Sequence, residues 1–158
     1  MLKFCTLFLQ AVVVLAAIAA LGLLLWEPQL EGRNAHATQF QIYFQDPFLA
    51  YAYTGAIAVF VALFKTFRLL GYVRQNRSFS PQSIGALKTI KLCALTVIGF
   101  VVTGEVMLLL SSFGESDDRT GGVAMGLLII FASAVVAAAA ALFEKILKDG
   151  AALNPAAA

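Results

Sequence analysis

Long apolar stretches constrain the fold of this 158-residue chain more than any other feature. The first covers residues 4–26 and is interrupted only by Thr6 and Gln10. As a helix it would extend about 34 Å, enough to cross a hydrocarbon core of about 30 Å. Three more stretches follow at residues 47–73, 92–113 and 122–143. The pattern predicts an all-α integral membrane four-helix bundle, made of two transmembrane hairpins in one domain over residues 1–149.

Composition supports a membrane protein. Hydrophobic residues make up 61% of the chain and charged residues 13%, and the mean hydropathy is +0.87. A water-soluble fold of this size has about 25% charged residues to cover its surface. The first apolar stretch is also longer than the 7–15 residues typical of the apolar region of a signal peptide. We therefore expect the first helix to be retained, although Ala35-His36-Ala37 resembles a cleavage site.

A basic segment at residues 65–91 joins the two hairpins. It contains six of the eleven Lys and Arg residues and no acid. With Lys3, Lys145 and Lys148, nine cations would lie on one side of the membrane, against Arg33 and Arg119 on the other. Because short cytoplasmic loops are enriched in Lys and Arg, this asymmetry predicts a multi-pass protein of the cell membrane with both termini in the cytoplasm.

The second half of the basic segment has the pattern of a helix start. Ser80 is a preferred N-cap, Pro81 suits the first helical position, and Phe79 and Ile84 have the spacing of a hydrophobic staple. We expect a short cytoplasmic amphipathic helix at residues 81–91, or else a plain extension of the following span. Residues 114–121 form an acidic turn in this prediction. Gly150 and Pro155 predict a disordered tail over residues 150–158.

The basic segment is the first candidate binding site. It would engage anionic lipid headgroups or an acidic partner protein, whereas the simpler interpretation is a topology signal alone. Nucleic-acid binding is not expected, because no recognised module fits so short a segment. The candidate docking residues are Arg74, Arg77, Phe79, Ser80, Pro81, Lys88 and Lys91.

Glu105 is the second candidate. It lies 14 residues beyond Lys91, about 21 Å along a helix, in the outer half of the bilayer. Intramembrane acids are costly and face the protein interior, a cavity or a partner, which suggests a protonatable or cation-binding carboxylate. Alternatively, the side chain is hydrated near the outer interface or paired, with Thr54, Thr103, Arg33 or Arg119 as the available partners.

A third candidate is a helix-packing face. Gly122 and Gly126 form a G-x-x-x-G pattern that Ala134 and Ala138 continue. Small residues at this spacing let helix backbones approach closely, either within the monomer or in a dimer.

Catalytic, metal and cofactor sites are not expected. No Ser or Cys has a plausible base partner, and no glycine-rich phosphate loop is present. His36 is the only histidine, and Cys5 and Cys93 are too few for a metal site and are expected to stay reduced. An enzyme is therefore not predicted.

An N-x-x-F-S-P motif at residues 76–81, followed by Leu87 and basic residues, resembles the bacterial membrane family catalogued as domain of unknown function 2975. The segments 131–133 and 143–147 are similar to the last helix of that family. The resemblance implies a four-helix cytoplasmic-membrane protein without an assigned activity. Many members appear to be encoded beside a small Cro-type regulator, which would imply a regulatory or stress-linked role. Many also continue into a polar tail, which the alanine-rich end of this chain lacks.

Taken together, the residues favour a membrane-embedded accessory or regulatory protein that engages a partner or anionic lipid through its basic segment. The alternative is a small carrier or channel for protons, cations or a small solute that uses Glu105.

Overall fold

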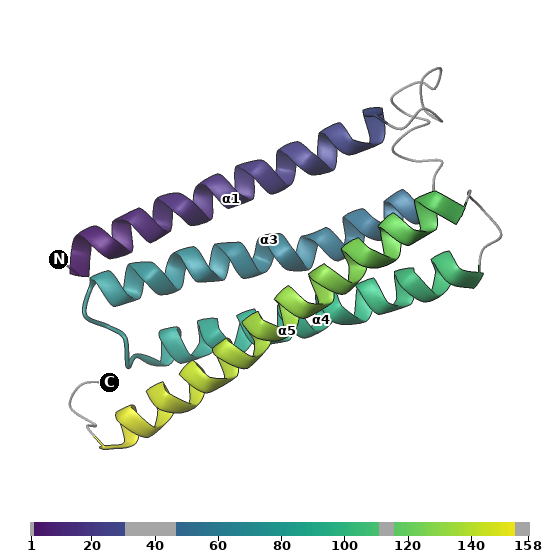
Figure 1. The fold of residues 1–158 in the computed structure, drawn as a ribbon. Helices are drawn as coiled ribbons and strands as arrows, with labels where there is room; N and C mark the ends of the chain where they lie inside the picture. Colours follow the sequence, from purple (N-terminus) through teal and green to yellow (C-terminus); the bar gives the residue numbers. More distant parts are fainter. Residues whose placement is uncertain (1, 31–46, 111–115, 154–158) are drawn as a thin grey trace.

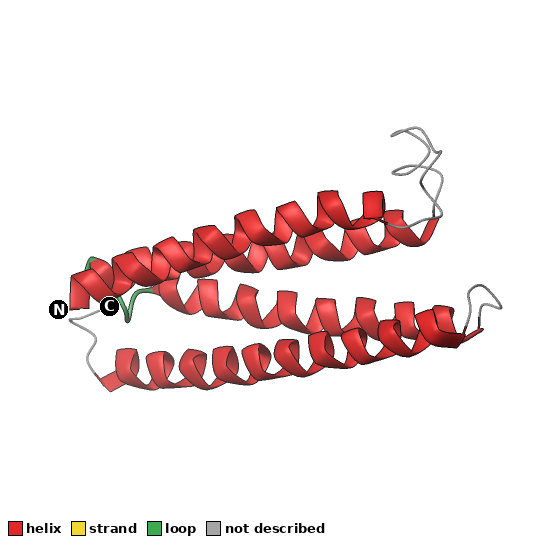
Figure 2. Cartoon of the chain, turned by 45° about the horizontal axis from the view of Figure 1, so that its top comes forward, coloured by secondary structure: helices red, strands yellow, loops and turns green. Residues whose placement is uncertain are grey.

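The computed structural model, which describes residues 2–30, 47–110 and 116–153, consists of four long helices (Figure 1). They are α1 (Leu2–Leu30), α3 (Pro47–Arg74), α4 (Pro81–Leu110) and α5 (Ser116–Leu153). Each contains a stretch long and apolar enough to cross a membrane. Within the described ranges all regular structure is helical (Figure 2). The predicted all-α four-helix membrane fold is confirmed.

The helices run up and down, so the start of α1, the α3–α4 turn and the end of α5 lie at one end of the molecule (Figure 1). Among the described residues, extensive contacts join only helices that are consecutive in the chain: α1 with α3, α3 with α4, and α4 with α5. The interface between α4 and α5 is the largest of the three. The bundle is therefore an open row in which α3 and α4 each have two neighbours.

Buried side chains on α4 and α5 follow a spacing of alternating three and four residues. On α4 they include Leu87, Ile90, Ala94 and Val97. This spacing is typical of left-handed packing in which the ridges of one helix fit the grooves of the next. Leu87 and Ile90 pack against Ala140 of α5, which is only 4% exposed. Small residues on α5 thus bring the two backbones close together.

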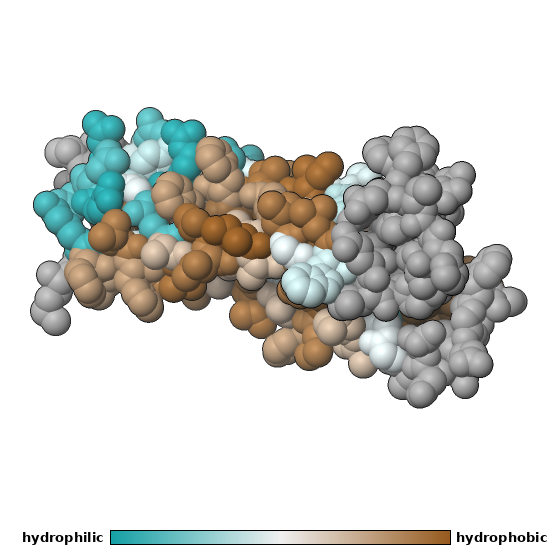
Figure 3. All heavy atoms as spheres, turned by 90° about the horizontal axis from the view of Figure 1, so that it is seen from above, coloured by the Kyte–Doolittle hydropathy of each residue, from teal (hydrophilic) through white to brown (hydrophobic). Residues whose placement is uncertain are grey.

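The first helix is attached differently, because the side chains that are buried in its described part, Thr6 and Gln10, are polar. The Nε2 atom of Gln10 donates a hydrogen bond to the carbonyl oxygen of Phe67 over 3.2 Å. Nearer the other end, the hydroxyl of Tyr53 donates to the carbonyl oxygen of Leu24 over 2.8 Å. Most other described α1 side chains are exposed, and the surface over the middle of the molecule is hydrophobic (Figure 3).

Several helix boundaries differ from the predicted ones, and at residues 81–91 the structure has the second of the two predicted alternatives. Residues 81–91 do not form a separate helix but are the first turns of α4, because their apolar side pairs directly with α5. α1 runs past residue 26 to Leu30, and α5 starts at Ser116, inside the predicted acidic turn. α5 also continues through Gly150 to Leu153, within the predicted disordered tail, because tertiary contacts hold its end. Residues 31–46, 111–115 and 154–158 lie outside the described residues.

Of the predicted packing residues on α5, Gly122 and Gly126 face α4, whereas Ala134 does not. Gly126 is buried, whereas Ala134 and Ala138 are exposed. At 3.6 residues per turn, eight residues rotate a side chain by about 80° from Gly126, whereas seven residues return it to within about 20°. The buried face therefore continues through Ser133 and Ala137.

This register predicts that Ala140→Leu destabilises the protein by about 1–3 kcal/mol, because the added atoms meet Leu87 and Ile90 in a packed interface. The matched change Ala134→Leu should leave stability nearly unchanged, since that side chain is exposed. Unfolding of both variants in mixed micelles with increasing dodecyl sulfate measures the difference. Equal effects would show that Ala140 does not lie in the seam.

Candidate functional site

The basic end of the molecule is built from the ends of helices that are longer than a hydrocarbon core is thick. From Lys91 to Leu110 α4 is about 30 Å long, the thickness of a hydrocarbon core, and the ten residues before Lys91 add about 15 Å. Figure 3 shows hydrophilic residues gathered at this end and hydrophobic residues over the middle of the molecule. The side chains of Arg74, Arg77 and Lys88 are exposed there.

The turn between α3 and α4 starts with a complete helix C-cap. Asn76 has a φ of 57°, a left-handed conformation that asparagine tolerates better than most residues. The amide of Arg77 donates to the carbonyl of Tyr72 over 2.9 Å, and the amide of Asn76 donates to that of Val73 over 3.1 Å. These two bonds define a Schellman motif, which satisfies the last carbonyls of α3.

The other side of the turn is the predicted N-cap. The amide of Ser83 donates to Oγ of Ser80 over 3.3 Å, and Pro81 occupies the first helical position. Ser83 itself is completely buried, and its hydroxyl donates to the carbonyl of Arg77 over 2.8 Å. This bond ties the turn to the first turn of α4 and fixes the backbone from which Arg77 extends.

Phe79 attaches the turn to α5. A Cβ atom placed on Gly150 would come within 2.5 Å of the Phe79 ring, so the glycine provides the space that the ring uses. The staple contact between Phe79 and Ile84 stays a prediction. The residues of the N-x-x-F-S-P motif therefore have separate structural tasks: Asn76 ends α3, Phe79 contacts α5, and Ser80 with Pro81 starts α4.

An ion-pair network that sequence reasoning missed joins α4 and α5 at this end. Nζ of Lys91 lies 2.6 Å from one carboxylate oxygen of Glu144, and Nζ of Lys148 lies 2.7 Å from the other. Glu144 is buried, with 7% of its side chain exposed. Lys91 is thus occupied within the protein, unlike the exposed cations of the docking set. The spacing of Glu144 and Lys148 was a readable signal, since residues four apart on a helix are neighbours.

Glu105 lies in the same interface, toward the opposite end. Its carboxylate occupies the space that a side chain on Gly126 would need. The buried atom Oε2 has no hydrogen-bond partner among the described residues. Two of the expected partners are engaged elsewhere, because Thr103 donates to the carbonyl of Gly99 and Thr54 to that of Ala50. The side chains of Arg33 and Arg119 lie outside the described residues.

Gly122, the other glycine of the G-x-x-x-G pattern, faces Leu108 of α4, whose Cδ2 atom would lie 3.0 Å from an added Cβ. Both glycines are therefore used for packing within one chain. In the part of the chain that the structure describes, no three His, Cys, Asp or Glu residues are grouped closely enough to hold a metal ion, and Cys5 and Cys93 are free thiols. His36 lies outside that part.

The ion-pair network predicts a measurable coupling between Lys91 and Glu144. Lys91→Met and Glu144→Gln should each lower the melting temperature, because each leaves a partner charge unpaired. The double variant should lose less than the sum of the two, since contacting residues are not additive. In the control cycle, Lys88→Met with Glu144→Gln should be additive because Lys88 is exposed. Additivity in both cycles would contradict the pairing.

Known proteins can now be compared with this geometry. The family model described as "Protein of unknown function (DUF2975)" matches residues 31–155. The chain is also 37% identical over 145 residues to the "Uncharacterized membrane protein YoaS" of Bacillus subtilis (strain 168), with 91% of this chain and 89% of that protein covered. No solved structure matches. The chain is a membrane protein that belongs to the DUF2975 family of unknown function.

Proposed function

We propose that this is a non-catalytic accessory or regulatory protein of the cell membrane that engages an acidic partner protein through its basic end. The observation that carries the proposal is the construction of the α3–α4 turn. Its backbone is fixed by the Schellman motif, the Ser83 hydroxyl and the Phe79 contact. Arg74, Arg77 and Lys88 are exposed on this fixed support, whereas Lys91 and Lys148 are held by Glu144.

The length of the helices favours a protein partner over lipid headgroups. The headgroup layer adds about 5–8 Å to each side of the hydrocarbon core. The turn lies about 15 Å along α4 from Lys91, so Arg77, in the turn itself, reaches the outer edge of that layer. Arg77 is therefore placed to meet the surface of another protein, whereas Arg74 and Lys88 stay within reach of the phosphates. Anionic lipid remains the other class of partner that the exposed cations suit.

The proposed orientation places the basic end in the cytoplasm. The excess of Lys and Arg at this end supports it, because positive residues stay on the cytoplasmic side. Both described chain ends lie at the same end as the turn (Figure 1), so one orientation accounts for the start of α1, the turn and the end of α5 together.

A single substitution, Arg77→Cys, tests orientation and partner together in a chain that also carries Cys5→Ser and Cys93→Ser. We expect a membrane-impermeant maleimide to label this position only after the cells are opened. A short thiol-reactive cross-linker at the position should then capture one defined protein, identified by mass spectrometry. Arg74→Glu with Lys88→Glu should reduce this capture at least tenfold, because like charges repel an acidic surface.

Labelling in intact cells would contradict the orientation. Cross-linking only to lipid, or to many proteins with no dominant product, would contradict partner docking. Val61→Cys, at an exposed apolar position in the middle of α3, serves as the control, because it should react with neither maleimide nor partner.

Glu105 supports a second candidate, a carrier or channel for protons, cations or a small solute. The observation in its favour is the buried Oε2 atom without a partner among the described residues. In hydrocarbon such an oxygen is costly, and binding a proton or cation would satisfy it.

The carrier proposal predicts that purified protein in liposomes dissipates an imposed pH or cation gradient. Glu105→Gln should reduce that flux to the rate of empty liposomes while circular dichroism shows unchanged helix content. Thr103→Val is a suitable control, because its hydroxyl bonds within α4. No flux from the wild-type protein would remove this candidate.

A further inference from the structure

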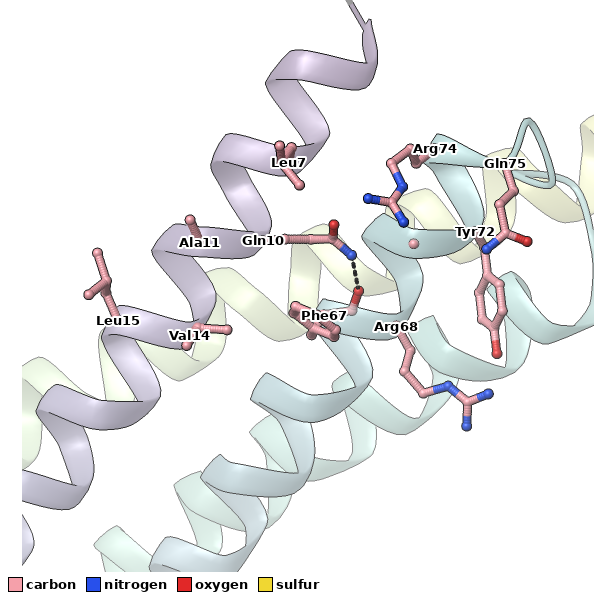
Figure 4. A pocket seen from close by; sticks show the side chains of 11 residues that line it. Leu7, Gln10, Ala11, Val14, Leu15, Phe67, Arg68, Tyr72, Arg74 and Gln75 are labelled. Atoms are coloured by element: carbon pink, nitrogen blue, oxygen red, sulfur yellow. Dashed lines mark hydrogen bonds between the residues drawn. The ribbon is translucent and has the colours of Figure 1, made fainter.

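A groove separates α1 from α3 at the basic end of the molecule (Figure 4). Its volume is about 770 Å³, and it is lined by side chains from Leu7 to Leu15 on α1 and from Phe67 to Gln75 on α3. Each wall is about 12 Å long, the depth of a headgroup and the upper part of a lipid chain. The groove involves α1, which takes no part in the exposed α3–α4 turn.

The polarity of the lining changes along the groove. Val14, Leu15 and Phe67 line the part nearer the middle of the membrane, and Arg74 and Gln75 line the part at the end of the molecule. Because α1 and α3 are antiparallel spans, this direction is close to the membrane normal (Figure 1). A phospholipid of the adjacent leaflet has the same gradient, with its phosphate outermost and its chains toward the centre.

The charge of the lining has one sign. Two arginines, Arg68 and Arg74, line the groove, and no acid is among the lining residues. In Figure 4 the side chain of Arg74 extends into the space between the helices. The guanidinium of Arg68 lies 5.8 Å from the ring centre of Tyr72 and 6.0 Å from that of Phe64, a cation–π arrangement that limits its position.

The floor of the groove is closed by a polar bridge. Gln10 reaches from α1 to the carbonyl of Phe67 and is only 7% exposed. Gly71 lies beside it, and a Cβ there would be 3.5 Å from Nε2 of Gln10. The bridge fixes the separation of the two helices, so the groove exists without a ligand.

We infer that this groove binds an anionic phospholipid of the leaflet that surrounds the basic end. Its phosphate interacts with Arg74, Arg68 adds a second positive charge from the α3 wall, and an acyl chain lies along Leu7, Val14 and Leu15. A second copy of this chain fits less well, because the exposed described residues of its α1 and α3 offer mostly apolar side chains and no acid to the arginines. The inference does not depend on the proposed partner docking and shares only Arg74 with it.

Titration of the detergent-purified protein with phosphatidylglycerol or phosphatidylcholine, followed by native mass spectrometry, tests the site. We expect one phosphatidylglycerol to bind each chain more tightly than phosphatidylcholine. Arg68→Gln with Arg74→Gln should weaken phosphatidylglycerol binding about 30-fold, from about 1 kcal/mol for each cation near the membrane surface. The matched pair Arg77→Gln with Lys88→Gln removes two cations outside the groove and should change binding by less than about threefold.

A second pair of variants tests the groove by volume. Ala11→Trp places a large side chain in the lining and should abolish binding of both lipids, whereas Ala16→Trp, an exposed position outside the lining, should not. Equal affinity for the two lipids would overturn the inference, and so would equal losses in the Arg68/Arg74 and Arg77/Lys88 pairs of variants. A wild-type chain that binds a second copy through this groove would also overturn it. If the Arg77→Cys chain captured no defined protein while the groove still bound phosphatidylglycerol, only the docking proposal would be overturned.

Discussion

The arrangement of the whole molecule depends on the close approach of α4 and α5. Within a membrane no hydrophobic force drives helices together, because lipid tails are as apolar as leucine side chains. Contact must come from tight packing and from polar groups. Here Gly126, Ala137 and Ala140 keep the surface of α5 shallow, so the backbones come close enough for Glu144 to meet Lys91. The same approach places Gly150 under Phe79 and so fixes the α3–α4 turn.

Two acids lie in this one interface and differ in how they are satisfied. Glu144, at the basic end, is buried and bonded through both oxygens to lysines. Glu105, nearer the other end, packs against Gly126 and has one buried oxygen without a partner in the described part of the chain. A paired acid is an ordinary structural element, whereas an unsatisfied one in hydrocarbon is costly and is usually retained for a function. The contrast identifies Glu105, not Glu144, as the candidate for chemistry.

The sequence predicted those parts of the fold that depend on local patterns. The length of the apolar stretches predicted the four spans. Ser80 and Pro81 predicted the start of α4, because a helix cap depends on neighbouring residues. The errors occurred where contacts between residues far apart in the sequence determine the structure. The ion pair of Glu144 was missed because Lys91 is 53 positions away in the chain. The end of α5 was placed too early because Gly150 is unfavourable in a helix unless a partner such as Phe79 fills the space beside it. The groove lined by Arg68 and Arg74 lies between α1 and α3, and no local sequence pattern marks a site formed by two separate helices.

The weak attachment of α1 has a consequence for how the molecule is assembled. The buried side chains in the described part of α1 are polar, and α1 packs mainly on α3. The family model begins at residue 31, after α1 has ended. The other three helices hold the ion pairs, the braced turn and Glu105 among themselves. Among the described residues, α1 contributes to none of these features. A change in α1 would therefore alter one wall of the groove and leave the ion pairs, the α3–α4 turn and the Glu105 contact as they are.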